Sequence, residues 1–135
     1  MKTAFVDANV FLRFFTSDDE GQHKQAAALL RKAAVGRIAL VTGPPVLFEI
    51  AWTLRSAYAQ PRDKVLDVLS RMAALPGLRL LDYDLVEEAV SLSHRSGQEF
   101  ADAYIMASAQ KAKAELIATF NHGDFEKMGA ELLPF

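Results

Sequence analysis

Short apolar segments alternate with longer helical patterns along this chain of 135 residues, and this alternation limits the folds that it can adopt. Apolar runs of three or four residues are typical of short buried strands. Four such runs occur, at residues 4–6, 38–41, 78–81 and 116–119, and residues 132–133 fit a small edge strand. Because short apolar strands separated by helices form a parallel sheet covered on both faces, we predict an α/β fold.

Helical patterns fill the stretches between these runs. Gly36 and Gly97 follow two of them as helix-ending residues. Pro44 and Pro45 stand where proline is tolerated, in the first turn of a helix. The helices expected from periodicity and these end signals are 10–15, 22–35, 46–58, 62–75, 84–95 and 100–113, with a short turn or helix at 123–128.

Length and composition narrow the class of protein. A chain of this length fits one domain, 1–135. Hydrophobic residues make up 51% and cysteine is absent, so wholesale disorder, disulfide scaffolds and thiolate metal sites are excluded. A net charge of −2 disfavours a strongly basic nucleic-acid binder but leaves room for a local basic patch. No signal peptide or membrane-spanning run is recognisable, so we expect a cytoplasmic protein with no membrane partner.

Four acidic residues stand near the predicted carboxyl ends of strands, where α/β folds usually carry their functional sites. Asp7 and Asp124 follow strands, whereas Glu49 and Asp102 lie on helices that begin near strand ends. Four carboxylates that share a pocket require cations, because their like charges would otherwise force some to be protonated. Mg²⁺ or Mn²⁺ would satisfy them and would support phosphodiester hydrolysis.

Glu49 and Asp102 are the more informative of these acids. Glu49 is surrounded by apolar residues, with no cation three or four positions away, so a buried carboxylate is expected there. Asp102 is expected to face the core with Ile105 and Met106. Alternatively, Glu49 turns to solvent or meets a distant cation, and Asp102 and Glu99 only complement the dipole of their helix.

Helix capping is the alternative role for the other two acids. Asp7 or Asn9 could cap the helix that follows the first strand. Asp124 could cap the short helix after the fourth strand.

The ordered set of motifs resembles the PIN-domain ribonucleases, and within them the VapC-type toxins of bacterial toxin–antitoxin pairs. The resemblance covers essentially the whole chain. It rests on segments 5–10 (FVDANV), 48–50 (FEI), 100–105 (FADAYI) and 118–125 (ATFNHGDF). Each motif is weak alone, but the set in this order and at these separations is specific.

The resemblance implies a three-layer α/β/α domain with a mainly parallel sheet of about five strands. It also implies an Mg²⁺- or Mn²⁺-dependent endoribonuclease toxin that cuts RNA, forms a homodimer and is neutralised by a cognate antitoxin. The residues that match the family's acidic quartet, and so its catalytic and metal-binding positions, are Asp7, Glu49, Asp102 and Asp124. Supporting polar positions are matched by Asn9, Thr119 and Asn121. Many members carry an acid where Asn121 stands, so either Asp124 or Asn121 fills the fourth position.

Other residues have less specific interpretations. RNA would need basic residues at the rim of such a pocket, and the candidates are Arg13, Lys24, Arg55 and Lys127. The three histidines are too scattered in sequence to form a metal trio, although His122 is expected near the site. Trp52 and most of the phenylalanines are expected in the core.

Two other classes of protein are compatible with an aspartate after the first strand. A receiver or haloacid-dehalogenase-like phosphoacceptor domain also places one there. The dehalogenase signature needs a second aspartate where Asn9 stands, and a receiver needs a lysine near the end of a late strand, which Thr119–Asn121 does not supply. A PIN-like module that only binds a partner is the other alternative, and the intact acidic quartet argues against it.

Overall fold

The computed structural model describes all residues, 1–135, and the chain forms two compact units. Unit 1 comprises Met1–Asp82 and unit 2 comprises Tyr83–Phe135. No helix is both long enough and apolar enough to cross a bilayer. The expectation of one domain over 1–135 stays a prediction.

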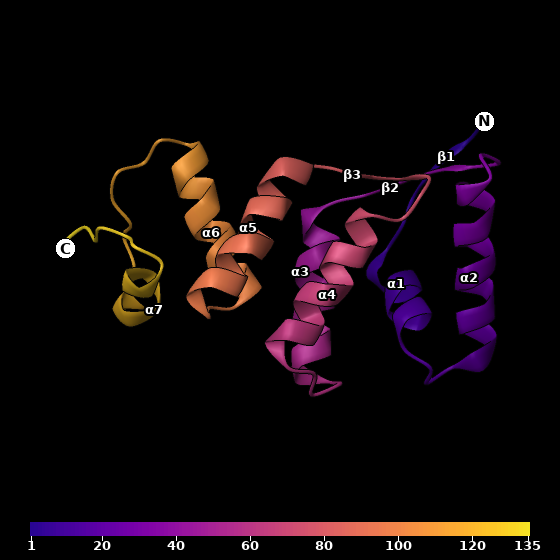
Figure 1. The fold of residues 1–135 in the computed structure, drawn as a ribbon, viewed down its shortest axis with the longest axis horizontal. Helices are drawn as coiled ribbons and strands as arrows, with labels where there is room; N and C mark the ends of the chain where they lie inside the picture. The colour runs from indigo at the N-terminus through magenta and orange to yellow at the C-terminus, as the bar shows by residue number, and fades with distance from the viewer. The chain divides into compact units, whose positions relative to one another are not determined.

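Unit 1 is built on a parallel sheet of three strands in the order β1-β2-β3 (Figure 1). The strands are β1 (Thr3–Phe5), β2 (Ala39–Thr42) and β3 (Leu78–Leu80). Phe5 pairs with Val41, and Thr42 pairs with Leu80. The buried Thr42 hydroxyl donates to the Val6 carbonyl oxygen at 2.9 Å, which ties the carboxyl ends of β1 and β2 together.

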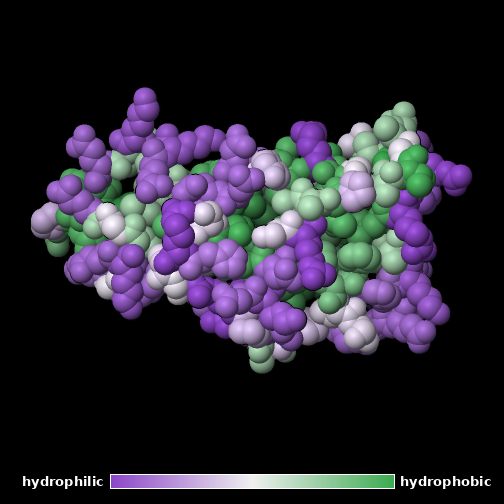
Figure 2. Space-filling model, viewed as in Figure 1, coloured by the Kyte–Doolittle hydropathy of each residue, from purple (hydrophilic) through white to green (hydrophobic).

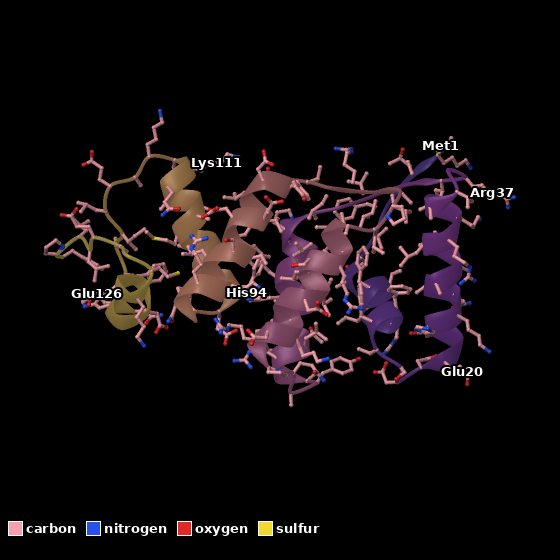
Figure 3. All side chains as sticks on the ribbon, in the orientation of Figure 1. Met1, Glu20, Arg37, His94, Lys111 and Glu126 are labelled. Atoms are coloured by element: carbon pink, nitrogen blue, oxygen red, sulfur yellow. The ribbon has the colours of Figure 1, made fainter.

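Two pairs of helices connect these strands. The first pair is α1 (Ala8–Phe15) and α2 (Glu20–Ala34), and the second is α3 (Pro44–Ser56) and α4 (Arg62–Ala73). Leu40, Leu47, Ile50, Leu66 and Leu69 are almost wholly buried between helices and sheet. Figure 2 shows a hydrophilic outer side on α2, and Figure 3 labels Glu20 at its start and Arg37 just beyond its end.

Unit 2 is helical. It contains α5 (Tyr83–Ser96), α6 (Phe100–Lys111) and the short α7 (His122–Lys127). α5 and α6 pack as a hairpin, seen in Figure 1, whose connection includes Gly97 at a positive φ of 78°. A cluster of buried side chains joins the three helices: Leu92, Ala103, Met106, Phe125 and Met128.

The α/β fold, the first three strands and all seven helices predicted from the sequence are confirmed, and no predicted end differs from the observed one by more than two residues. The expectation of about five strands in one sheet is not met, because the sheet has three. Residues 116–119 and 132–133 instead form a single parallel bridge, Ile117 with Leu132. The main-chain N–H of Ile117 donates to the Glu131 carbonyl oxygen, and the Ile117 carbonyl oxygen accepts from the Leu133 N–H. The side chains of Ile117 and Leu132 pack against the buried cluster of unit 2, so this segment is partly buried there and not in the sheet.

Candidate metal and active site

Asp7 begins α1 directly after β1. Its neighbours Val6 and Ala8 are buried, and the Val6 N–H donates to the Val41 carbonyl oxygen at 2.8 Å, so the backbone on both sides of Asp7 is fixed. Asp7 is the N-cap residue of α1, yet its side chain makes no capping hydrogen bond. Capping therefore does not occupy the Asp7 carboxylate, which is exposed and available to a ligand.

Glu49 lies in the second turn of α3, which starts two residues after β2. The expectation of a buried Glu49 is wrong, because this side chain is exposed. Residues 46, 47, 50, 51 and 54 form the buried face of α3, and the helical repeat turns position 49 away from it. Trp52 lies on the exposed side one turn later and is 72% exposed, so its expected place in the core is also wrong. The sequence alternative in which Glu49 faces solvent is the one observed.

Asp102 and Asp124 are brought together within unit 2 by the packing of α6 against α7. Their sequence neighbours Ala103 and Phe125 are both members of the buried cluster described above. Asp102 lies in the first turn of α6, and Asp124 lies in the first turn of α7. Asp102 is half-buried, and no hydrogen bond or ion pair in the chain involves its side chain.

The surroundings of Asp102 disfavour its charged form. Partial burial raises the pKa of the Asp102 carboxyl above its ordinary value, and the negative charges of Asp124 and Glu99 raise it further. No cation offsets this repulsion. A half-buried carboxylate beside like charges is an arrangement that a divalent cation would stabilise.

A chain of hydrogen bonds orients Asp124. The Thr119 hydroxyl oxygen accepts from the Asn121 backbone N–H at 2.9 Å, and the Asn121 side-chain amide donates to Asp124 Oδ2 at 2.8 Å. Asn121, not Asp124, is the N-cap residue of α7. The expected supporting residues Thr119 and Asn121 thus lie beside Asp124, and the amide of Asn121 acts as a donor to the acid.

The donor set fits Mg²⁺ or Mn²⁺ in its chemistry, since hard cations prefer carboxylate oxygens. Asp7 and Glu49 belong to unit 1, and Asp102 and Asp124 belong to unit 2. Within either unit, no three histidine, cysteine, aspartate or glutamate side chains come together as a metal site. His94 lies on α5, as Figure 3 shows, and no three histidines come together as a group.

The expected rim cations differ in their availability. Arg13 forms an ion pair with Asp18 at 2.9 Å, and Lys24 pairs with Glu20 at 3.2 Å. Arg55 donates to the Gln60 carbonyl oxygen at 3.1 Å. Lys127 is exposed at the end of α7.

Sequence reasoning missed a polar network around Asp18. The hydroxyl groups of Tyr58 and Thr16 donate to its carboxylate at 2.6 and 2.8 Å, and Arg13 donates at 2.9 Å. These bonds lower the pKa of Asp18 to about 2, with the Tyr58 hydrogen bond as the largest cause. Tyr58 lies 40 residues from Asp18, and no local pattern connects the two.

Comparison with known proteins identifies the family. A sequence model of the PIN domain matches residues 4–131, so this chain belongs to the PIN-domain family. PIN domains are typically metal-dependent ribonucleases, and the α/β fold with a parallel sheet flanked by helices agrees with membership. A search among curated proteins found no significant match.

Proposed function

We propose that this PIN domain is an endoribonuclease in which Asp7, Glu49, Asp102 and Asp124 hold Mg²⁺ or Mn²⁺. The observation that carries the proposal is Asp102, a half-buried carboxylate whose pKa is raised by burial and by the neighbouring charge of Asp124, with no cation of the chain to compensate. Asp7 supports it, because this carboxylate occupies an N-cap position without capping the helix.

The residues of the chain have separable roles in this proposal. A divalent cation, when bound, would activate water and stabilise charge on a phosphodiester group. Asp7 presents its carboxylate from a fixed turn, and Asn121 holds Asp124 in one orientation through the 2.8 Å hydrogen bond. Asn9 supports the pocket by its position two residues after Asp7. The 2′-hydroxyl of RNA need not take part, so products should carry 5′-phosphate and 3′-hydroxyl ends.

The finer identity rests on the resemblance of the motifs. We propose that the chain is a VapC-type toxin, forms a homodimer in the cytoplasm and is neutralised by a cognate antitoxin. We also propose that residues 1–135 make up a single PIN domain. Sedimentation velocity on the purified chain tests the dimer directly.

Cleavage of an RNA panel tests the enzymatic proposal. The panel contains tRNA, ribosomal RNA fragments and single strands, and each reaction is run with Mg²⁺, with Mn²⁺ and with EDTA. We expect metal-dependent cutting that falls at least about 100-fold in Asp7→Asn, because even outer-shell changes at metal sites cost about 10- to 100-fold. Asp84→Asn, on the exposed first turn of α5, is the matched control and should cut normally.

Two results would contradict this proposal. Cutting that is unchanged in Asp7→Asn would place the activity in another site or in a contaminant. If no RNA is cut and Mn²⁺ does not bind, the chain is a non-catalytic PIN-like module, and a structural reason would be needed for Asp102.

A further inference from the structure

Two cavities of unit 1 are lined in part by Arg13, and Asn9 is their only lining residue that also has a role in the proposed metal site. The larger, of about 470 Å³, lies between α1 and α2, and the other, of about 410 Å³, reaches Thr53 and Tyr58. Both are lined by Asn9 and Arg13. These volumes fall within the roughly 300–1,000 Å³ typical of small-ligand pockets. Asn9 stands two residues after Asp7, so the cavities begin close in sequence to a proposed metal ligand.

The guanidinium group of Arg13 is held in one orientation between the cavities. Its Nε donates to Gln22 Oε1 at 2.6 Å, and its Nη1 donates to Asp18 Oδ2 at 2.9 Å. No hydrogen bond within the chain uses Nη2, and the side chain is 34% exposed. Arg13 therefore presents two unused N–H donors from a fixed frame, which lowers the entropic cost of binding a ligand.

The local charge indicates which ligand suits the larger cavity. Asp18 is ionised at neutral pH because its pKa is about 2, so it neutralises Arg13. A phosphate group would gain little from such a neutral pair. An uncharged ligand that accepts hydrogen bonds would lose no affinity through this neutralisation, because it does not depend on the net charge of Arg13.

The other side chains that line the larger cavity are also uncharged. The polar side chains other than Arg13 are the amides of Asn9, Gln22 and Gln25, each able to donate and to accept. The apolar side chains are Val10, Ala26 and Leu29. A lining of amides and aliphatic groups suits a flat group with a hydrogen-bonding edge and apolar faces.

We propose that the cavity between α1 and α2 is a nucleobase-binding subsite that determines which base of an RNA strand the enzyme accepts. The inference rests on the proposed ribonuclease function and specifies its substrate selectivity. Amide side chains recognise base edges, and Arg13 adds donors of fixed direction. Gln25 is the residue to test, because it is exposed and makes no hydrogen bond within the chain.

Binding is measured first, in a protein that does not cut. Asp7→Asn in EDTA is titrated with single-stranded RNA hexamers of each base, and the side-chain amide signals of Gln22 and Gln25 are followed by NMR. We expect shifts of these signals that differ between bases. When Gln25→Leu is added to Asp7→Asn, affinity for the preferred hexamer should fall about fivefold relative to Asp7→Asn alone, which is the effect of losing one neutral hydrogen bond. Gln110→Leu, an exposed glutamine of α6, should leave affinity unchanged.

Cleavage-site selection is the second readout. If the wild-type chain cuts RNA, Gln25→Leu should change the base preference beside the cut while keeping the dependence on metal. RNA that binds or is cut without shifting the Gln22 and Gln25 signals overturns the subsite and leaves the ribonuclease intact. A chain that neither binds nor cuts RNA overturns both. Shifts of these signals caused only by a protein partner would assign the cavity to protein binding and overturn the subsite.

Discussion

Asp18 and Asp102 show how surroundings set the pKa of the same side chain in opposite directions. Asp18 accepts hydrogen bonds from Tyr58 and Thr16 and pairs with Arg13, so its charged form is stabilised and its pKa falls to about 2. Asp102 is partly buried, receives no hydrogen bond and meets the charge of Asp124, so its pKa rises. A carboxylate whose charged form is disfavoured by its surroundings is characteristic of functional sites. Such sites lower the stability of the folded protein in exchange for activity.

Asp102→Asn should therefore separate stability from activity. In the metal-free protein at neutral pH, we expect a higher melting temperature than wild type, because the amide is not penalised by burial or by Asp124. The folded wild type binds a proton at Asp102 more readily than the unfolded chain does, so its stability falls as pH rises through this titration. The advantage of Asp102→Asn should thus shrink as pH falls and Asp102 becomes protonated. Thermal unfolding between pH 3 and 8 measures this.

Activity of the same variant completes the test. RNA cleavage by Asp102→Asn should fall at least about 100-fold, whereas Asp84→Asn should change neither cleavage nor melting temperature appreciably. A destabilised Asp102→Asn protein at neutral pH would show that the Asp102 carboxylate has a structural partner.

At the scale of elements, the turn before β3 depends on one glycine. Gly77 has a positive φ of 80°, and a Cβ placed there would lie 2.3 Å from the Ala33 carbonyl oxygen on α2. Gly36, just after α2, has a similar φ of 79° but has open space around it. The two glycines therefore share a backbone conformation, but only Gly77 lies against another part of the chain.

Gly77→Ala should destabilise unit 1 by about 2 kcal/mol or more, because strain at positive φ adds to a clash with backbone. Gly36→Ala is the matched control and should cost only about 1 kcal/mol, for the positive φ alone. Urea unfolding followed by circular dichroism gives both values. Equal losses for the two variants would mean that α2 moves readily away from the turn.

At the scale of the whole molecule, the binding of a cation to the folded chain tests the four proposed ligands. A cation that binds only the folded chain stabilises it, and this stabilisation grows with the logarithm of the cation concentration above the dissociation constant. Binding therefore reports on the proposed ligands without requiring the correct RNA substrate.

Mn²⁺ should raise the melting temperature of the wild-type chain, and EDTA should reverse the increase. When the free Mn²⁺ concentration is 100 times the dissociation constant, the free energy of unfolding should rise by about 2.7 kcal/mol. Asp7→Asn and Asp124→Asn should each reduce the shift, whereas Asp84→Asn should retain it. An equal shift in all four proteins would place the cation elsewhere on the surface.

Local signals in the sequence predicted much of the fold. Periodicity identified α2 and α4, glycines after α2 and α5 marked their ends, and Pro44 and Pro45 marked the start of α3. The match to the PIN-domain family agrees with the motifs recognised at residues 5–10, 48–50, 100–105 and 118–125. These features depend on residues that are close together in the chain, so they can be predicted from the sequence without the tertiary structure.

Other features depend on partners far away in sequence. Residues 116–119 read as a strand of the sheet, but their observed partner is the segment around Leu132. Apolar neighbours around Glu49 suggested burial, yet the direction in which α3 packs leaves Glu49 and Trp52 exposed. The low pKa of Asp18 needs Tyr58 from 40 residues away. Residue order encodes periodicity and turn chemistry, whereas burial, strand partners and pKa values arise only when distant segments pack together.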